Sequence, residues 1–228
     1  LSRPMVWKLH CPTLKKILGI GVPNGLENSM FQLGKILVLS LVTQFGTAAI
    51  AANAVSNTIA VFQTLPGTAM GNAILTVCAQ CVGANEFQQV RYYTKKLMKI
   101  IYAGLVVSCI AVILLMPLVL DIYSLSEEAT KMAKQILAYH GICTMLIWPL
   151  SFSLPNTLRA SNDVTFCMVL SIFSMWVFRI GFSYVLGLVF HLGVFGVWVA
   201  MTIDWAVRAV CFLIRYLRGK WQKKAFAV

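Results

Sequence analysis

The sequence predicts an all-α membrane protein with six transmembrane helices, and three observations lead to that prediction. Of the 228 residues, 59% are hydrophobic and only 11% are charged, whereas soluble domains are about 45–50% apolar and about 25% charged. The mean hydropathy is +0.80. The apolar residues gather into segments of roughly 20 residues or more, the length that a helix needs to cross a hydrocarbon layer of about 30 Å.

Six helices follow from the positions of the polar turns between these segments. Gly46-Thr47 separates the first two, and Gly83-Ala84-Asn85-Glu86 ends the second. Ser124-Leu125-Ser126-Glu127 offers a hydroxyl and a carboxylate that can cap the fourth. Further polar turns stand at 159–163 and 191–193. The predicted helices therefore span about residues 17–45, 49–82, 94–120, 127–158, 163–190 and 194–217.

Four prolines stand inside these segments, at Pro23, Pro66, Pro149 and Pro155. Proline removes a backbone donor and disfavours an uninterrupted helix. Within a membrane such breaks are tolerated where the freed backbone groups face protein or a cavity. We therefore expect these four positions to be helix breaks that line a cavity.

The net charge of +12 comes from basic residues at alternate ends of the apolar segments, so lipid headgroups rather than nucleic acid are their expected neighbours. Fourteen of the 19 Lys and Arg residues fall in the N-terminal stretch, the 83–99 loop, the 159–163 turn and the C-terminal tail. Only Lys131 and Lys134 fall on the opposite side. This asymmetry predicts a multi-pass protein of the cell inner (plasma) membrane with both termini cytoplasmic.

Other function classes lack support in the sequence. The seven cysteines are an odd number within mostly apolar segments, which indicates reduced thiols rather than a disulfide framework. Cys78-Ala79-Gln80-Cys81 has no strand–helix redox context around it. No H-E-x-x-H, nucleophile elbow or phosphate loop is present. We expect a protein that is not an enzyme and carries no cofactor.

Glu27 is the centre of the functional prediction. If Lys15 and Lys16 mark the water boundary, Glu27 lies ~16 Å into the layer at ~1.5 Å per residue. A carboxyl at that depth is costly unless it faces a partner, a cavity or an ion. Without a cation nearby it would hold a proton, and a bound Na⁺ would keep it ionised. The pattern favours a transport site, with a neutral acid hydrogen-bonded to the next helix as the alternative.

A charge network is also predicted within the spans, formed by Asp204, Arg208, Arg179 and Lys35. Asp204 and Arg208 stand four residues apart on one helix face, so a structural ion pair is favoured. Arg179, near the middle of its span, needs an anion, and Glu27 and Asp204 are the candidates. Lys35 is nearer the outer surface and can extend its ammonium group toward it.

Several segments together resemble the second half of the multidrug and toxic compound extrusion (MATE) transporters. They are the stretches 21–27, 31–35, 46–55, 66–67, 82–84, 158–163, 193–198, 204–208 and 219–221. Leu158-Arg159-Ala160-Ser161-Asn162-Asp163 is similar to the family's LRG-x-x-D turn, with alanine in place of the usual glycine. No single motif is decisive, and their order and spacing carry the resemblance across nearly the whole chain.

The resemblance implies a twelve-helix antiporter of two six-helix lobes, of which residues 1–228 form the second lobe and the N-terminal lobe is absent. Such antiporters export small cationic amphiphilic drugs or metabolites in exchange for Na⁺ or H⁺. The resemblance assigns coupling, and a Na⁺ site, to Glu27 and Asp163, and a helix cap is the alternative role for Asp163. The chain opens on Leu1-Ser2-Arg3-Pro4 and is expected to be a piece of a longer protein.

Two other functions stay open at this point, a lipid-linked oligosaccharide flippase of the same superfamily and a non-catalytic membrane scaffold. A flippase is expected to have a more cationic central cavity. Three basic groups lie in the spans, and Glu27 and Asp204 are expected to offset two of them, so the sequence does not demand such a cavity.

Overall fold

The structure is a computed structural model that describes residues 11–225, except for the side chains of residues 12, 13, 16, 20 and 223–225. The basic residues of the predicted N-terminal stretch before residue 11 lie outside the described part. All regular elements between residues 11 and 225 are helical. Their bounds are α1 Cys11–Val42, η1 Thr43–Phe45, α2 Thr47–Gly83, α3 Phe87–Ile122, α4 Glu127–Leu146, η2 Pro149–Ser153, α5 Leu154–Ala160, α6 Val164–Ser174, η3 Met175–Gly181, α7 Phe182–Tyr184, η4 Val185–Val189, α8 Gly193–Leu217 and α9 Lys220–Ala225.

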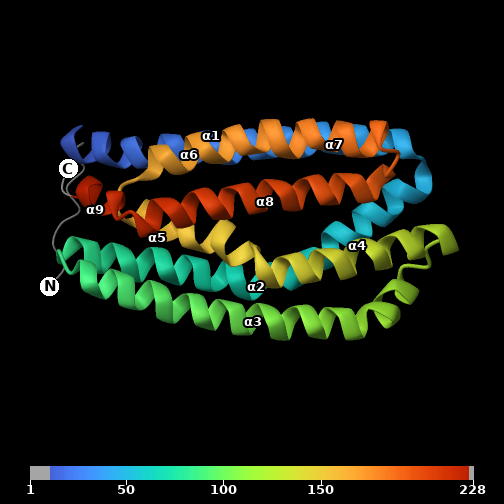
Figure 1. Cartoon of the computed structure of the whole chain (residues 1–228), viewed down its shortest axis with the longest axis horizontal. Coiled ribbons are helices and arrows are strands. Elements are labelled where there is room, and N and C mark those ends of the chain that lie inside the picture. The colour runs from blue at the N-terminus through green and yellow to red at the C-terminus, as the bar shows by residue number, and fades with distance from the viewer. Residues whose placement is uncertain (1–10, 226–228) are drawn as a thin grey trace, which may run out of the picture.

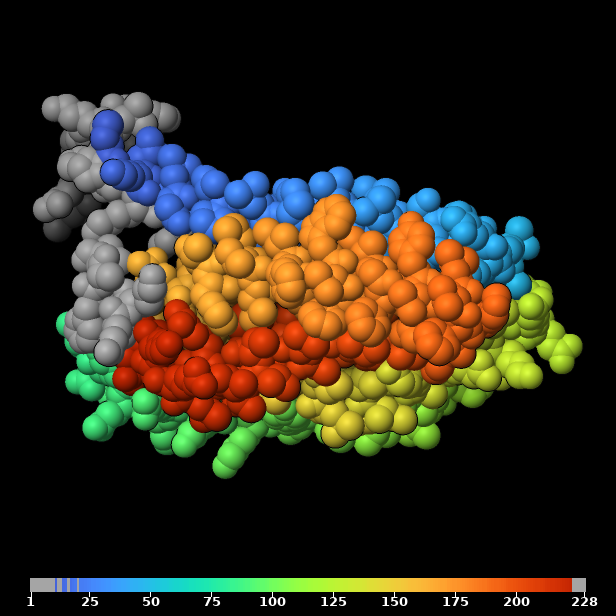
Figure 2. All heavy atoms as spheres, turned by 45° about the horizontal axis from the view of Figure 1, so that its top comes forward, coloured from blue at the N-terminus to red at the C-terminus, as the bar shows by residue number. Residues whose placement is uncertain are grey.

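The long helices form a bundle in which the start of α1 and the short helix α9 lie at the same end (Figure 1). The chain thus passes along the bundle an even number of times. Helix α1 packs side by side with the segment from α6 to α7 along one face (Figure 2). Helix α8 lies between this layer and the layer of α2, α3, α4 and α5 (Figure 1).

Four stretches of helix in the described part are long and apolar enough to cross a membrane: α2, α3, Val164–Val189 and α8. The bent pair Glu127–Leu146 and Pro149–Ala160 makes a fifth. Helix α1, predicted as a span, is 32 residues long but is less apolar than these stretches and is not one of them. Its polar residues explain the difference: Asn24, Glu27, Asn28, Gln32 and Lys35 interrupt its apolar sequence.

The proline predictions need correction at two positions. Helix α1 continues through Pro23 and α2 continues through Pro66, so neither residue ends its helix. At Pro149 a π-helical segment begins, and the chain bends by 59° between α4 and the Pro149–Ala160 stretch, which contains Pro155. Helix α2 passes this bend closely, because a Cβ atom on Gly67 would overlap the ring of Trp148.

The predicted helix at 163–190 is not a uniform α-helix. Its two π-helical segments, η3 and η4, enclose the single turn α7. Such wider turns are often found at functional sites. Segment η3 carries Arg179, one of the residues in the predicted charge network.

Apolar packing holds the bundle together, and apolar side chains also cover its outside. One buried cluster includes Leu41, Ile74, Leu105 and Phe212, and a second joins α2, α3 and α4 around Leu120. Exposed Leu, Ile and Val side chains cover much of α3, including Leu114 and Ile122. A helix that is apolar on its exposed side is typical of a lipid-facing span.

The ends of two elements are fixed by specific side chains. The Ser126 hydroxyl caps α4 by accepting a hydrogen bond from the Ala129 amide at 3.3 Å, so a hydroxyl of the predicted segment caps the helix but Ser124 and Glu127 do not form a capping box. Trp221 of α9 is fully buried, and its indole donates to the Tyr216 carbonyl at 3.0 Å. The ring of Trp221 also stacks on that of Tyr216, so α9 is held against the end of the bundle.

Candidate functional site

Glu27 lies at the middle of α1 and faces α5. It is only 4% exposed, and its Oε1 atom accepts a charge-assisted hydrogen bond from Nη2 of Arg159 at 2.7 Å. The second carboxylate oxygen, Oε2, is buried and has no hydrogen-bond partner within the described residues. Glu27 is therefore an ion-paired carboxylate with one oxygen available to another group.

Arg159 connects Glu27 to α2 through a chain of hydrogen bonds. Its Nη1 atom donates to Oδ1 of Asn156 at 3.0 Å, and Nδ2 of Asn156 donates to the Gly71 carbonyl at 2.9 Å. Arg159 and Asn156 both belong to α5, which the bend at Pro149 directs toward α1 and α2. The bend thus places the arginine that neutralises Glu27.

Asp163 forms a separate pair with Arg215 of α8. The guanidinium donates to both carboxylate oxygens, from Nε at 2.7 Å and from Nη2 at 3.0 Å, and Asp163 is 3% exposed. Asp163 occupies the N-cap position of α6, but its side chain makes no capping hydrogen bond. The carboxylate therefore serves the link between α6 and α8 rather than the helix end.

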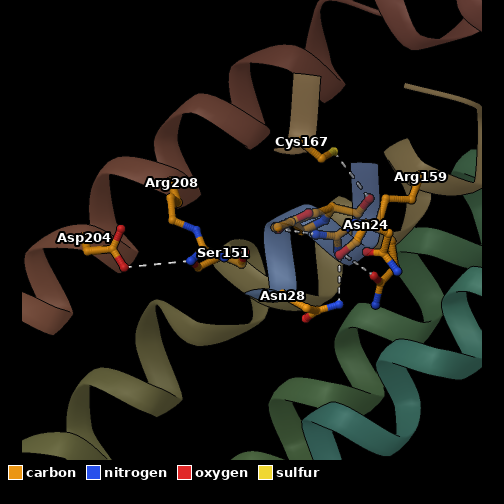
Figure 3. Close-up of polar contacts among 10 residues, drawn as sticks. Asn24, Asn28, Ser151, Arg159, Cys167, Asp204 and Arg208 are labelled. Carbon is orange, nitrogen blue, oxygen red and sulfur yellow. Dashed lines mark hydrogen bonds and ion pairs between the residues drawn. The ribbon is translucent and has the colours of Figure 1, made fainter. Parts of the chain in front are cut away.

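Asp204 and Arg208 form the predicted pair on α8, with Nη1 of Arg208 3.8 Å from Oδ2 of Asp204. The guanidinium of Arg208 lies between the rings of Phe31 and Phe152, at 5.0 and 4.6 Å from their centroids. Its Nε and Nη1 atoms have no hydrogen-bond partner within the described part of the chain. Oδ1 of Asp204 accepts from the Ser174 hydroxyl. Figure 3 shows Asp204, Arg208 and Ser151 on one side and Asn24, Asn28 and Arg159 on the other.

A cavity of about 270 Å³ joins Glu27 to Arg208, and we call it the Glu27 cavity. Helix α1 supplies one wall, and η2, α5 and α8 supply the other. Two oppositely charged buried groups with unpartnered polar atoms, Glu27 and Arg208, face the same space. The lining residues are Asn24, Glu27, Asn28, Phe31, Gln32, Lys35, Phe152, Arg159 and Arg208.

A second cavity of about 340 Å³ lies farther along the bundle, and we call it the outer cavity. Lys35 lines both cavities, and Arg179 lines the outer one. In the described part of the chain, no ion pair joins Arg179 to Glu27 or Asp204, the two anions expected for it. The outer cavity is lined by Lys35, Val38, Leu39, Asn53, Asn57, Val61, Arg179, Val197, Trp198 and Met201.

The structure thus gives the predicted site residues different neighbours. Glu27 and Asp163 each pair with their own arginine, so an ion held jointly by the two acids stays a prediction. Within residues 11–225 no group of three or more His, Cys, Asp and Glu side chains could hold a metal. A cation at Glu27 would also meet the positive charge of Arg159 at 2.7 Å from the carboxylate, which opposes Na⁺ binding until that pair opens.

Pro66 lines an apolar groove beside α3 rather than either polar cavity.

Sequence reasoning missed two partners that matter here, Arg159 and Arg215. Both had been counted only as basic residues of the polar ends. Asp204, Arg208 and Arg215 are spaced by four and seven residues, which places them on one face of a helix. That spacing was a signal for a charged stripe on α8, whereas the approach of Arg159 to Glu27 depends on the bend.

A buried polar cluster between α2, α4 and α8 was missed as well. Nδ1 of His140 contacts Oε1 of Gln63, whose Nε2 donates to the Leu137 carbonyl at 3.3 Å. His140 meets the rings of Trp198 and Trp205 edge-on. All of these side chains come from segments that read as apolar, so only tertiary packing reveals the cluster.

The comparisons agree with this architecture. The family model MatE matches residues 23–185. The chain is 27% identical over 221 residues to "Probable multidrug resistance protein YoeA" of Bacillus subtilis, covering 95% of this chain and 46% of that protein. It is 24% identical over 229 residues to "Uncharacterized transporter YisQ" of Bacillus subtilis, covering 100% of this chain and 50% of that protein. The chain thus spans about half the length of these relatives.

The fold has the same kind of neighbour among solved structures. A multidrug resistance MATE family transporter of the MOP superfamily, in an outward-facing conformation, superimposes with a TM-score of 0.85. It is 20% identical, and the match covers 97% of this chain and 50% of that one. The bundle therefore corresponds to one lobe of such a transporter. Because the family model spans most of the sequence, this chain belongs to the MatE family.

Proposed function

We propose that this chain is the C-terminal lobe of a secondary active exporter that expels small cationic amphiphilic compounds in exchange for Na⁺ or H⁺. The observation that carries the proposal is Glu27, a carboxylate buried in a membrane lobe with one unpartnered oxygen on a cavity. Buried carboxyls of this kind mark ion pathways in transporters. Family membership and the transporter names of the relatives support export. A transporter is thereby favoured over an enzyme.

Coupling would work through the Glu27–Arg159 pair. When the carboxyl takes up H⁺ or Na⁺, its attraction for the guanidinium falls, and Arg159 is released. Arg159 is hydrogen-bonded to Asn156, which in turn donates to the Gly71 carbonyl. Movement of Arg159 would therefore change the contacts that α5 makes with α1 and α2. An organic cation would compete with Arg159, and with H⁺ or Na⁺, for the Glu27 carboxylate. The coupling ion and the substrate would then bind in turn rather than together.

Asp163 has the complementary role in this proposal. Its two hydrogen bonds to Arg215 join the start of α6 to the end of α8. Bidentate pairs of this type fix geometry as well as add energy. We infer that Asp163 keeps α6 and α8 in register while Glu27 exchanges partners. Asp163 would take part in coupling only if the Asp163–Arg215 pair opens.

In the proposed topology the protein lies in the cell inner (plasma) membrane, and both termini are in the cytoplasm. The start of α1 and α9 share one end of the bundle (Figure 1). Arg91, Arg159 and Arg218 lie at or near the helix ends that face this side. The positive-inside rule assigns that end to the cytoplasm. In this arrangement the first lobe would cover the polar face of this one, and lipid would cover α3.

Removal of the Glu27 charge in the two-lobe exporter tests the proposal. Glu27→Gln should abolish efflux of ethidium driven by an imposed Na⁺ or H⁺ gradient in proteoliposomes, while the amount of protein in the membrane stays unchanged. The matched control is Glu86→Gln, because Glu86 is exposed before α3 and caps no helix through its side chain. Undiminished gradient-driven efflux by the Glu27→Gln protein would contradict the proposal.

The same vesicles separate the alternatives. A lipid-linked oligosaccharide flippase would move a labelled polyprenyl-linked sugar without exporting ethidium, and a scaffold would move neither.

A further inference from the structure

The outer cavity has an unusual charge for a site within a membrane lobe. Lys35 and Arg179 both line it, and its other polar residues are Asn53 and Asn57. None of its lining residues is acidic. Basic groups inside a membrane domain normally pair with an anion, so the source of negative charge for this cavity needs an explanation.

The three buried acids of the lobe each form an ion pair with an arginine other than Arg179, although the charge of Asp204 also acts on Arg179 over a longer distance. Glu27 pairs with Arg159, Asp163 with Arg215 and Asp204 with Arg208. These are the three ion pairs within the described residues, and none of them involves Lys35 or Arg179. The two cations at the outer cavity are therefore left without a carboxylate within 4 Å in this part of the chain.

The remaining polar groups add to the preference for an anion. The indole Nε1 of Trp198 donates to Oδ1 of Asn53 at 3.0 Å. With its amide oxygen accepting from this indole, the NH₂ group of Asn53 can donate to a ligand. An ammonium, a guanidinium and an amide NH₂ are all donors, and charged donors bind carboxylate or phosphate oxygens strongly.

The rest of the wall is apolar. Val38, Leu39, Val61 and Met201 come from three different helices and surround the polar groups. Lys35, Asn53 and Trp198 each lie about five to seven residues from the nearby helix end, which at ~1.5 Å per residue is a depth of ~8–10 Å. A ligand held here would keep its charged group below the membrane surface and its apolar part against aliphatic side chains.

We propose that the outer cavity binds the acidic group of an amphiphile, a carboxylate or a phosphate, through Arg179 and Lys35. The acidic group could belong to an anionic membrane lipid or to a transported molecule, and the two share the same chemistry at the cavity. The site differs from the Glu27 cavity in that no acidic side chain lines it, although Lys35 lines both. The inference rests on the cavity alone and is tested by binding without a gradient, so its failure would leave the exporter proposal standing.

The test is a fluorescence titration of the two-lobe exporter in phosphatidylcholine nanodiscs with dansyl-undecanoic acid and its uncharged methyl ester. We expect the acid to bind at least about ten-fold more tightly than the ester, since charge-assisted hydrogen bonds form only with the acid. Arg179→Gln and Lys35→Gln should each reduce that preference, and the double variant should remove it. Arg179→Lys, which keeps the charge, should retain most of it.

Lys131→Gln is the matched control, because Lys131 is an exposed residue of α4 that does not line the outer cavity. It should leave the preference unchanged. Equal binding of acid and ester by the unaltered protein would overturn the proposal, as would a preference that survives in the folded Lys35→Gln and double variants. The first result would be expected if an acidic side chain of the other lobe neutralises the two cations.

Two further arms identify the source of the acidic group. If phosphatidylglycerol added to the nanodiscs displaces the dansyl acid, and only when Lys35 and Arg179 are intact, a membrane lipid occupies the cavity. If instead the acid accumulates in vesicles under an ion gradient and phosphatidylglycerol has no effect, the cavity belongs to a transported amphiphile. Both results support an acidic ligand and differ only in its origin.

Discussion

The pair formed by Glu27 and Arg159 allows a quantitative test of the site. Replacing Arg159 with Gln would leave the Glu27 carboxylate, 4% exposed, without its counterion. Loss of one partner of a buried ion pair typically costs about 3–5 kcal/mol of unfolding free energy. Because the Arg159 side chain is 19% exposed, water softens the loss, and we expect a cost near the lower end, ~3 kcal/mol.

The double variant Glu27→Gln/Arg159→Gln should be less destabilised than the sum of the single variants. It contains no unpaired charge, and two amides can still form a neutral hydrogen bond worth ~1 kcal/mol. The coupling free energy between the two positions should then be about 2 kcal/mol, well above the ~0.3–0.5 kcal/mol scatter expected for independent sites.

The measurement is equilibrium unfolding of the two-lobe protein in mixed micelles of SDS and a mild detergent, followed by tryptophan fluorescence. The exposed residues Glu128 and Lys131 of α4 provide the control cycle, for which we expect a coupling of at most about 0.5 kcal/mol. Additive effects of Glu27→Gln and Arg159→Gln would refute the view that these residues stabilise one another in the folded lobe.

Three other changes have expected outcomes in the same unfolding assay. Asp163→Asn should cost about 3 kcal/mol, because it leaves the guanidinium of Arg215 with a neutral partner in a mostly buried site. Gly67→Ala should cost about 1–3 kcal/mol, since the added methyl group overlaps the ring of Trp148 at the bend. Ser126→Ala should cost ~1 kcal/mol through loss of the α4 cap.

Each of these changes has a matched control. Glu86→Gln neutralises an exposed acid, Gly19→Ala adds a methyl group where nothing lies within 4 Å, and Ser124→Ala removes a hydroxyl that is not the α4 cap. A variant that proves no more destabilising than its control would show that the corresponding contact does not hold the lobe together.

Much of the fold could be predicted because short polar turns separate the apolar segments of the sequence. The turns at Gly46 and at 159–163 separate helices close to the predicted positions. The helix interiors were harder. Helix α1 accepts Pro23 without interruption, and the stretch from Val164 to Val189 contains π-helical segments that no proline or other local signal in the sequence predicted.

The candidate site could be predicted only in part. The spacing of Asp204 and Arg208 follows from helix geometry, and both residues and Glu27 are buried within the lobe, whereas the depth of Glu27 in the membrane stays a prediction. The partner of Glu27 does not follow from helix geometry. Arg159 reaches it because the chain bends by 59° at Pro149, and a sequence does not state the angle at which a proline-containing segment turns.

That one contact changes the charge balance of the whole lobe. The sequence-based expectation let Glu27 and Asp204 offset two of the three basic residues within the spans. Arg159, counted as a residue of the turn, takes Glu27 instead, and Asp204 remains with Arg208. Of the three basic residues within the spans, Lys35 and Arg179 then have no ion-pair partner among the described residues, and both line the outer cavity. Because the bend pairs Glu27 with Arg159, the charges around Glu27 are paired while the outer cavity stays positive, and Lys35 lines both cavities, so an ion that opens the Glu27 pair and an acidic ligand would both act next to Lys35.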